Sequence, residues 1–156
     1  MTTARDGFQG IAVDWAASGG VLGGVAGIGS GLLGGIYLAF SVAVLPALRR
    51  RPAGEAAATM REVNRVILNP VFGALFAGTA LTCAALLLAG VLAGDPLRIA
   101  GAVTGLTAFV VTVAVNIPLN TALDRGGEWD SFAPRWTVAN HVRAATSVLT
   151  VVLLYL

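Results

Sequence analysis

The sequence has little charge and no lysine. Charged residues make up 12% of its 156 residues, against about 25% in an average soluble domain. All ten basic residues are arginine, and the formal net charge is only +2. Because these arginines lie between apolar stretches, the composition argues against a nucleic-acid-binding protein and fits the loop charges of a membrane protein.

Histidine and cysteine each occur once, and this scarcity limits the chemistry. Cys83 lies inside an apolar stretch, has no disulfide partner within the chain and provides no pair of metal ligands, so we expect it to contribute only packing. The long apolar stretches also contain no acidic residue. The sequence therefore argues against a histidine-rich or carboxylate-rich metal site, a haem with two histidine ligands from one chain, and the carboxylate relay of proton-coupled transporters.

Apolar residues are abundant, at 56% of the chain, and they fall into four long stretches. Each stretch is long enough to cross a hydrocarbon core of about 30 Å as an α-helix. We therefore predict an all-α fold, a four-transmembrane-helix bundle with up-down-up-down topology in a lipid bilayer. The predicted helices cover residues 20–48, 69–93, 97–122 and 136–156. The N-terminal segment 1–19 is predicted to lie in the membrane interface, and a short surface helix is predicted from Glu55 onward.

The arginines predict the orientation of this bundle. Seven of them lie in the loops 49–65 and 123–137, and only Arg5 and Arg98 lie on the other side of the predicted membrane. Loops rich in arginine stay in the cytoplasm. We therefore expect both loops to be cytoplasmic and both chain termini to lie outside.

Glycine recurs at every fourth position of the first predicted helix, which places a stripe of small residues on one helix face. Such a stripe allows another helix backbone to approach closely, either within the bundle or across the seam of a homo-oligomer. The stripe consists of Gly19, Gly23, Gly27, Gly31 and Gly35. The segment 29–34 also matches a dinucleotide-binding motif, but it lies in the middle of a membrane helix and follows no strand, so we reject that interpretation.

Strong hydrogen-bonding side chains gather at three helix ends. Because neighbouring helices run in opposite directions, these three ends meet at the same membrane face. Polar side chains at membrane depth usually face the bundle interior or a cavity, so we expect a pocket between the helices. Its predicted residues are Asn64, Asn69, Asn116, Asn120, Trp136, Asn140, His141 and Arg143.

The predicted pocket combines one base with several donors. His141 is the only side chain there that exchanges a proton near neutral pH. Arg143 supplies a fixed positive charge, and the asparagines and Trp136 supply neutral donors. This set suits the deprotonation of a weakly acidic, hydrophobic small molecule and the stabilisation of the resulting oxyanion.

Four motifs occur in order along the chain: "SVAVLPAL", "MREVNRVILNP", "VNIPLNTAL" and "RWTVANHVR". Together they resemble the DUF1772, or anthrone oxygenase-like, family of integral membrane proteins over about residues 20–156. The most specific parts are Asn116-Ile-Pro-Leu-Asn120 and the run from Trp136 to Arg143.

The resemblance implies a membrane monooxygenase that oxidises an anthrone to a quinone with O2 as co-substrate, with no organic cofactor or metal firmly implied. On this basis we expect His141 to remove the substrate proton. Arg143, Asn116 and Asn140 would stabilise the anion, and Trp136 would form an aromatic wall. The other substrate-binding residues would be Asn64, Asn69 and Asn120.

Three other interpretations remain open from the sequence. The polar cluster could be a hydrogen-bonded plug that fixes the helices of a non-enzymatic structural or accessory membrane protein. The chain could be a small-molecule carrier, although it shows no inverted repeat and no intramembrane carboxylate. An oxygenase that holds a metal with a ligand from another subunit also stays open.

Overall fold

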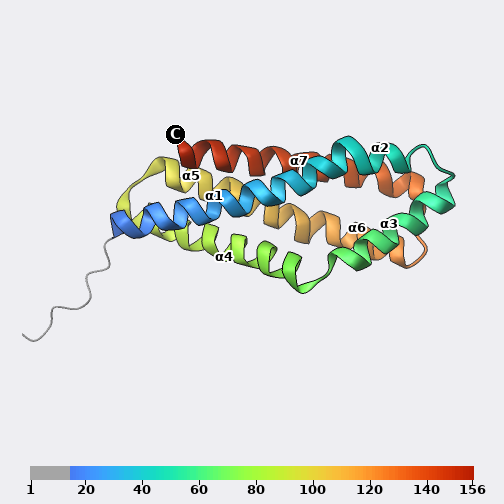
Figure 1. Cartoon of the computed structure of the whole chain (residues 1–156), viewed down its shortest axis with the longest axis horizontal. Coiled ribbons are helices and arrows are strands. Elements are labelled where there is room, and N and C mark those ends of the chain that lie inside the picture. The colour runs from blue at the N-terminus through green and yellow to red at the C-terminus, as the bar shows by residue number, and fades with distance from the viewer. Residues whose placement is uncertain (1–14) are drawn as a thin grey trace, which may run out of the picture.

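The computed structural model describes residues 15–156, with side chains from Gly20 onward, as an antiparallel bundle of four long helical rods (Figure 1). The first rod comprises α1 (Trp15–Ala39), the π-helical turn η1 (Phe40–Val44) and α2 (Leu45–Leu48). The second is α4 (Pro70–Ala93). The third comprises α5 (Pro96–Val111), a second π-helical turn η2 (Thr112–Asn116) and α6 (Ile117–Asp124), and the fourth is α7 (Trp129–Tyr155). A fifth helix, α3 (Ala53–Ile67), connects the first two rods at one end of the bundle.

The rods form a closed ring in which α1 and α5 each pack against both α4 and α7. The start of α1 and the C-terminus lie at the same end of the bundle (Figure 1). Four helical segments are long and apolar enough to cross a membrane, namely Gly20–Leu48, Pro70–Ala93, Pro96–Asp124 and Trp129–Tyr155. The prediction of an all-α bundle with four candidate membrane spans is therefore confirmed, and no strand occurs among residues 15–156.

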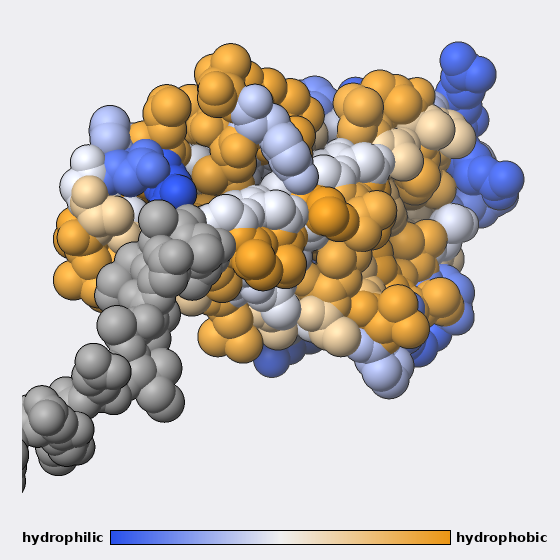
Figure 2. Space-filling model, turned by 60° about the vertical axis from the view of Figure 1, so that its left-hand side comes forward, coloured by the Kyte–Doolittle hydropathy of each residue, from blue (hydrophilic) through white to orange (hydrophobic). Residues whose placement is uncertain are grey.

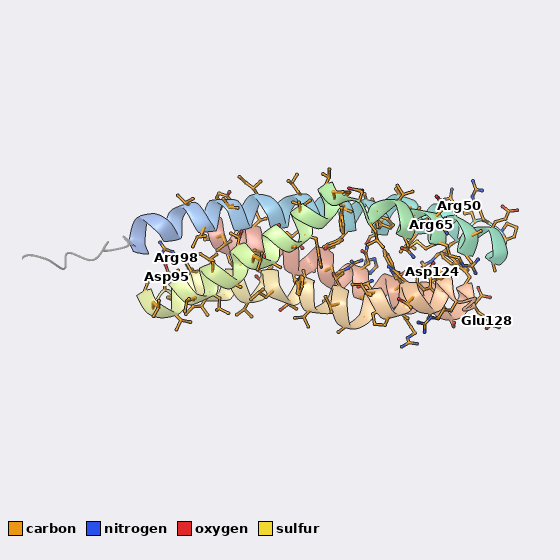
Figure 3. The ribbon with its side chains drawn as sticks, turned by 90° about the horizontal axis from the view of Figure 1, so that it is seen from below. Arg50, Arg65, Asp95, Arg98, Asp124 and Glu128 are labelled. Carbon is orange, nitrogen blue, oxygen red and sulfur yellow. The ribbon has the colours of Figure 1, made fainter. Side chains whose placement is uncertain are left out.

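The surface agrees with a bilayer environment. Figure 2 shows apolar side chains over most of the flank and hydrophilic residues toward the two ends. Asp95 and Arg98 lie at the end where α1 begins, whereas Arg50, Arg65 and Glu128 lie at the opposite end (Figure 3). The protein is thus an integral membrane protein. Which end faces the cytoplasm stays a prediction, and residues 1–14 of the expected interfacial segment lie outside the described part of the chain.

The fourth helix begins earlier than the sequence suggested. We expected a polar loop over residues 123–137, but α7 starts at Trp129 and leaves only residues 125–128 between the helices. Trp129, Phe132, Ala133 and Trp136 are all buried, and their i, i+3, i+4, i+7 spacing forms the apolar stripe of an amphipathic helix. This stripe extends the fourth rod beyond the apolar stretch on which the prediction relied.

Helix α3 closes the same end of the bundle. Its helical conformation is as predicted, and Arg65 forms an ion pair with Glu62 on its surface. It is not a free surface helix, however, because Ala56 and Met60 are fully buried in a hydrophobic cluster with α2, α6 and the first turns of α7. The rods therefore end in a hydrophobic cap formed by α2, α3, the end of α6 and the first turns of α7.

The first and third rods each contain a π-helical turn shortly before a proline. The N–H groups of Leu45 and Ile117 bond to carbonyls five residues earlier, and Pro46 and Pro118 follow directly. A proline ring crowds the carbonyl four residues before it, and the wider turn relieves this crowding. Such turns occur mostly as isolated bulges, often at functional sites, because they change the direction of the side chains that follow.

The glycine stripe packs against α7 at two of its positions. A Cβ added at Gly27 would lie 2.7 Å from Cε2 of Tyr155, and one added at Gly31 would lie 3.6 Å from Cγ2 of Val151. Gly23 and Gly35 face open space, and the surroundings of Gly19 lie outside the described side chains. Packing within the chain therefore accounts for part of the stripe, and a homo-oligomer stays a prediction for the rest.

Gly29 makes the closest approach in α1, and we expect its replacement by alanine to destabilise the bundle. The new Cβ would overlap with Oγ1 of buried Thr79, a stiff β-branched side chain. Overpacking of this kind costs about 1–3 kcal/mol. Gly35→Ala is the matched control, because it adds the same methyl group to the same helix in open space and gains helix propensity. In thermal unfolding in detergent, we expect Gly29→Ala to have a lower Tm than the wild type and Gly35→Ala to have no lower Tm. Equal Tm values for the two variants would contradict the close contact at Gly29.

Candidate functional site

A cavity of about 430 Å³ lies between the rods, just inside the cap. Its wall comes from α1, η1, α3, α4, η2, α6 and α7, and most of it is apolar. Leu68, Asn69 and Pro70, at the corner between α3 and α4, line the cavity and are exposed. The cavity therefore reaches the molecular surface at this corner, where Leu68, which is 81% exposed, and Pro70 form an apolar mouth.

The structure brings six of the eight predicted site residues to this cavity. They come from three regions of the sequence, namely 64–69, 116–120 and 136–143. These residues are Asn64, Asn69, Asn116, Asn120, Trp136 and Arg143. The predicted convergence of polar helix ends is thus seen as an arrangement in space, while the chemical role of each residue remains to be argued.

Arg143 is a buried cation whose partners are all neutral. It lies near the middle of α7, and only 6% of the residue is exposed. Its Nη2 donates to Oδ1 of Asn140 at 2.7 Å, and its Nη1 donates to Oγ1 of Thr112 at 3.4 Å. The guanidinium carbon lies 4.2 Å from the ring centre of Tyr37 and 5.2 Å from that of Trp136. No carboxylate among the described residues pairs with it, and its Nε has no hydrogen-bond partner there.

An isolated cation is expensive to bury, because it loses its hydration. Neutral donors, acceptors and aromatic faces recover only part of that cost. An anion or a strongly polarised oxygen beside Arg143 would offset the rest of this free-energy cost. Arg143 lines the cavity, so a ligand bound there can supply such a group.

Asn140 supports Arg143 from outside the cavity. It is fully buried, and its Nδ2 donates to the carbonyl of Tyr37 at 2.7 Å and to Oγ of Ser41 at 2.8 Å. Its Oδ1 accepts from Arg143. Asn140 thus fastens α7 to the first rod and orients the guanidinium, which is a positioning role, and it is not itself among the residues that line the cavity.

Asn120 and Asn69 have structural tasks at the cavity wall. Oδ1 of Asn120 accepts from Nε1 of Trp136 at 2.8 Å, which fixes the indole ring in the wall. Asn69 is exposed and caps α4, since its Oδ1 accepts from the N–H of Phe72 at 3.0 Å. A side chain that caps a helix in this way satisfies an otherwise unpaired backbone donor.

Asn64 and Asn116 have side-chain amide atoms that form no hydrogen bond with the described residues. Asn116 is 1% exposed, and neither its Nδ2 nor its Oδ1 has a partner in the described part of the chain. The Nδ2 of Asn64, which is 7% exposed, is also unpaired there. Buried polar groups nearly always have partners, so two unpaired amides in the wall of one cavity indicate a ligand site.

His141 lies outside this group, which corrects the expectation that it borders the cavity. Its side chain is exposed, and it is not part of the cavity wall. The reason is geometric: successive helical residues differ by about 100° around the axis. Because Asn140 and Arg143 both face inward, that step turns His141 away from the bundle interior.

Tyr37, Thr112 and Ser41 belong to the site, and the sequence analysis missed them. All three lie next to or within a π-helical turn and contact Asn140 or Arg143. A signal was present in the chain, because "SVAVLP" at 41–46 resembles "TVAVNIP" at 112–118. Ser41 and Thr112 start these two runs and face the same pair of α7 residues from two sides.

A metal site is not evident in the part of the chain that the structure describes. Over residues 15–156 no three side chains of histidine, cysteine, aspartate or glutamate come together as potential metal ligands. The polar groups at the cavity are amides, hydroxyls and a guanidinium. Such groups are suited to hydrogen bonding with an oxygen-bearing ligand and are poor ligands for transition metals.

The fold and the cavity define a class: a small four-helix integral membrane protein with a largely apolar internal pocket that contains one buried cation. The sequence model of the anthrone oxygenase family matches residues 60–153, which is more than half of the chain. The chain therefore belongs to the anthrone oxygenase family, also known as DUF1772. No curated protein and no solved structure matches the chain.

Proposed function

We propose that the protein is a membrane oxygenase that binds an anthrone-type aromatic ketone in this cavity as its enolate and allows the enolate to react with O2. Membership of the anthrone oxygenase family supports the reaction class. The observation that carries the proposal is the buried Arg143, which has neutral partners and a free Nε–H at the cavity.

Arg143 is placed to stabilise an oxyanion. Deprotonation of the methylene group of an anthrone moves negative charge onto its carbonyl oxygen. A preorganised donor aimed at the atom where charge develops stabilises that state more strongly in a water-poor site than it would in water. The amides of Asn116 and Asn64 supply further donors in the same wall.

The cavity also fits a flat aromatic molecule. Phe40, Phe72, Phe76 and Trp136 contribute aromatic faces to its wall, and the ring centres of Phe40 and Trp136 lie 5.5 Å apart. Aromatic rings pack favourably at such separations. A hydrophobic substrate would enter from the bilayer through the apolar mouth at the corner between α3 and α4.

The proposed reaction balances without a further reductant. Water in the cavity accepts the methylene proton, and the carbanionic carbon transfers its electron pair to O2 to form a carbon–oxygen bond. The resulting peroxide anion takes back the proton that the water had accepted, and the hydroperoxide then loses water as the second carbonyl forms. Anthrone and O2 thus give anthraquinone and one water, with the carbon oxidised and both oxygen atoms reduced. In this scheme the protein supplies binding, exclusion of bulk water and stabilisation of the enolate.

A purely structural plug explains the cluster less well. The contacts of Asn140 and the bond between Asn120 and Trp136 fit that alternative. The unpaired atoms of Asn116 and the Nε of Arg143 do not, because a plug without a ligand leaves them buried and unsatisfied around an open cavity.

The proposal is tested with the purified protein in lipid nanodiscs. Anthrone is added, and O2 uptake is recorded together with the anthraquinone absorbance. We expect both rates to exceed those of empty nanodiscs, with one O2 consumed per anthraquinone formed. Rates equal to those of empty nanodiscs at saturating anthrone would refute the proposed activity.

His141→Gln is expected to leave this turnover nearly unchanged, because His141 is exposed and lies outside the cavity wall. A general base at the reacting carbon contributes about 10²–10⁴-fold, so its loss would be obvious in the same assay. A loss of that size would show that His141 acts as the general base, and it would contradict the mechanism proposed above.

A further inference from the structure

The guanidinium of Arg143 contacts three other residues of the cavity wall. Its carbon lies 4.2 Å from the ring centre of Tyr37 and 5.2 Å from that of Trp136, and its Nη1 donates to Oγ1 of Thr112 at 3.4 Å. All four residues line the cavity of about 430 Å³. The contacts of the guanidinium itself therefore place the cation in the cavity wall.

Arg143 has more hydrogen-bond donors than it uses within the protein. A guanidinium carries five N–H groups and no acceptor, and in the described part of the chain it donates only to Asn140 and Thr112. No carboxylate of that part forms an ion pair with it. The planar guanidinium matches the two oxygens of a carboxylate, and such charge-assisted hydrogen bonds are about twice as strong as those between neutral groups.

The rest of the cavity suits the body of an amphiphilic acid. Its wall is largely apolar and includes the aromatic rings of Phe40, Phe72 and Phe76. Leu68 and Pro70 form its mouth, and Pro70 is also the first residue of the second candidate membrane span. The mouth thus lies where the apolar flank of the bundle meets its polar end. An acid with an apolar body collects at such a border in a bilayer, because its body leaves water and its carboxylate does not.

We infer that the cavity binds apolar monocarboxylates, with the carboxylate paired to Arg143 and the apolar body against the aromatic wall. Such a ligand brings its own negative charge, whereas the enolate of the proposed reaction forms only after a proton is removed. An aromatic acid and a fatty acid both have this chemistry. A further consequence rests on the proposed function: a bound acid inhibits anthrone turnover, because it competes with anthrone for the same cavity.

Binding is measured by equilibrium dialysis of the purified protein in lipid nanodiscs, and empty nanodiscs correct for partition into lipid. The ligands are anthracenecarboxylate and dodecanoate, each compared with its neutral alcohol, anthracenemethanol or dodecanol. We expect at least one acid to bind about 10–100-fold more tightly than its alcohol, which is the factor that a hydrogen bond to a charged group typically contributes. The acid that binds more tightly shows whether an aromatic acid or a fatty acid is the better ligand. Acetate, which has no apolar body, should not displace it at the same concentration.

Two variants remove the proposed ion pair in opposite ways. Arg143→Met deletes the cation. Thr112→Asp places a carboxylate where Oγ1 of Thr112 now accepts from Nη1 of Arg143, so that the counter-ion comes from the protein itself. In both variants we expect the acid to bind no more tightly than the alcohol, and binding of the alcohol shows that the cavity is intact. Arg135→Met is the matched control and should keep the preference, because Arg135 is an exposed arginine of the same helix that does not line the cavity.

Equal affinities of acid and alcohol in the wild type would overturn the inference. A preference for the acid that survives in Arg143→Met or Thr112→Asp, or that is lost in Arg135→Met, would overturn it as well. Displacement by acetate at equal concentration would indicate a site for small anions instead. None of these measurements uses turnover. Acid binding without anthrone oxidation would therefore contradict only the proposed function, and oxidation without a preference for the acid would contradict only this inference.

Discussion

Arg143→Met is expected to abolish anthrone turnover while leaving the bundle folded. Methionine fills a similar elongated space and removes a charge that is buried without a counter-ion. Replacing buried charge by well-packed apolar side chains is often neutral or stabilising. The loss of a donor to a developing oxyanion typically costs about 10²–10³ in kcat, so the variant should combine an unchanged or higher Tm with a turnover reduced by that factor.

Arg143→Lys separates the effect of charge from that of geometry. Lysine keeps the positive charge but lacks the planar fork through which Arg143 joins Asn140 and Thr112. We expect a turnover between those of the wild type and Arg143→Met, measured as O2 uptake at saturating anthrone. Wild-type turnover in Arg143→Met would show that the buried cation takes no part in the reaction.

Asn140→Leu is expected to be the most destabilising single change in the site. Asn140 is fully buried and takes part in three hydrogen bonds that connect α7 to the first rod and to Arg143. Leucine would leave Arg143 and Ser41 without these partners, and each buried group left unsatisfied costs about 1–3 kcal/mol. For a chain of this size the sum corresponds to a drop in Tm of roughly 10 °C.

Asn69→Ala is the matched asparagine control for that experiment. Asn69 is exposed and caps the first turn of α4, so its loss should cost only about 1 kcal/mol. Circular dichroism during thermal unfolding in detergent distinguishes the two variants. Similar small decreases in both would mean that the bonds of Asn140 contribute little to holding α7 against the first rod.

The spans and the convergence of polar residues followed from the sequence, because hydropathy and antiparallel topology are nearly sufficient to specify them. The start of α7 did not, because Trp129 and Phe132 are buried by the cap and not by lipid, and hydropathy does not distinguish a cap core from a loop. The side that His141 faces was also missed. A step of about 100° from Asn140 is compatible with either the edge of a cavity or the outer surface, and only the neighbouring helices decide between them.

The sequence also could not predict which asparagine side chains form hydrogen bonds within the protein. Asn116 and Asn120 are four residues apart and share a helix face, as expected. Among the described residues only Asn120 meets a partner, because Nε1 of Trp136 lies at its level and not one turn earlier. Which amide serves the fold and which remains free for a ligand depends on the relative heights of α6 and α7, and this is a property of tertiary packing.

The π-helical turns determine which side chains of the two rods face the cavity. Each turn holds one more residue than an α-helical turn would, so it acts as a one-residue insertion in an otherwise regular rod. If the same residues formed an ordinary α-helix, everything after the turn would be rotated by about 100°. Asn116 and Asn120 would then leave the cavity wall, although length, hydropathy and topology would hardly change. Among proteins with this fold, the two prolines and the widened turns before them are therefore a more sensitive marker of an intact pocket than composition or overall similarity.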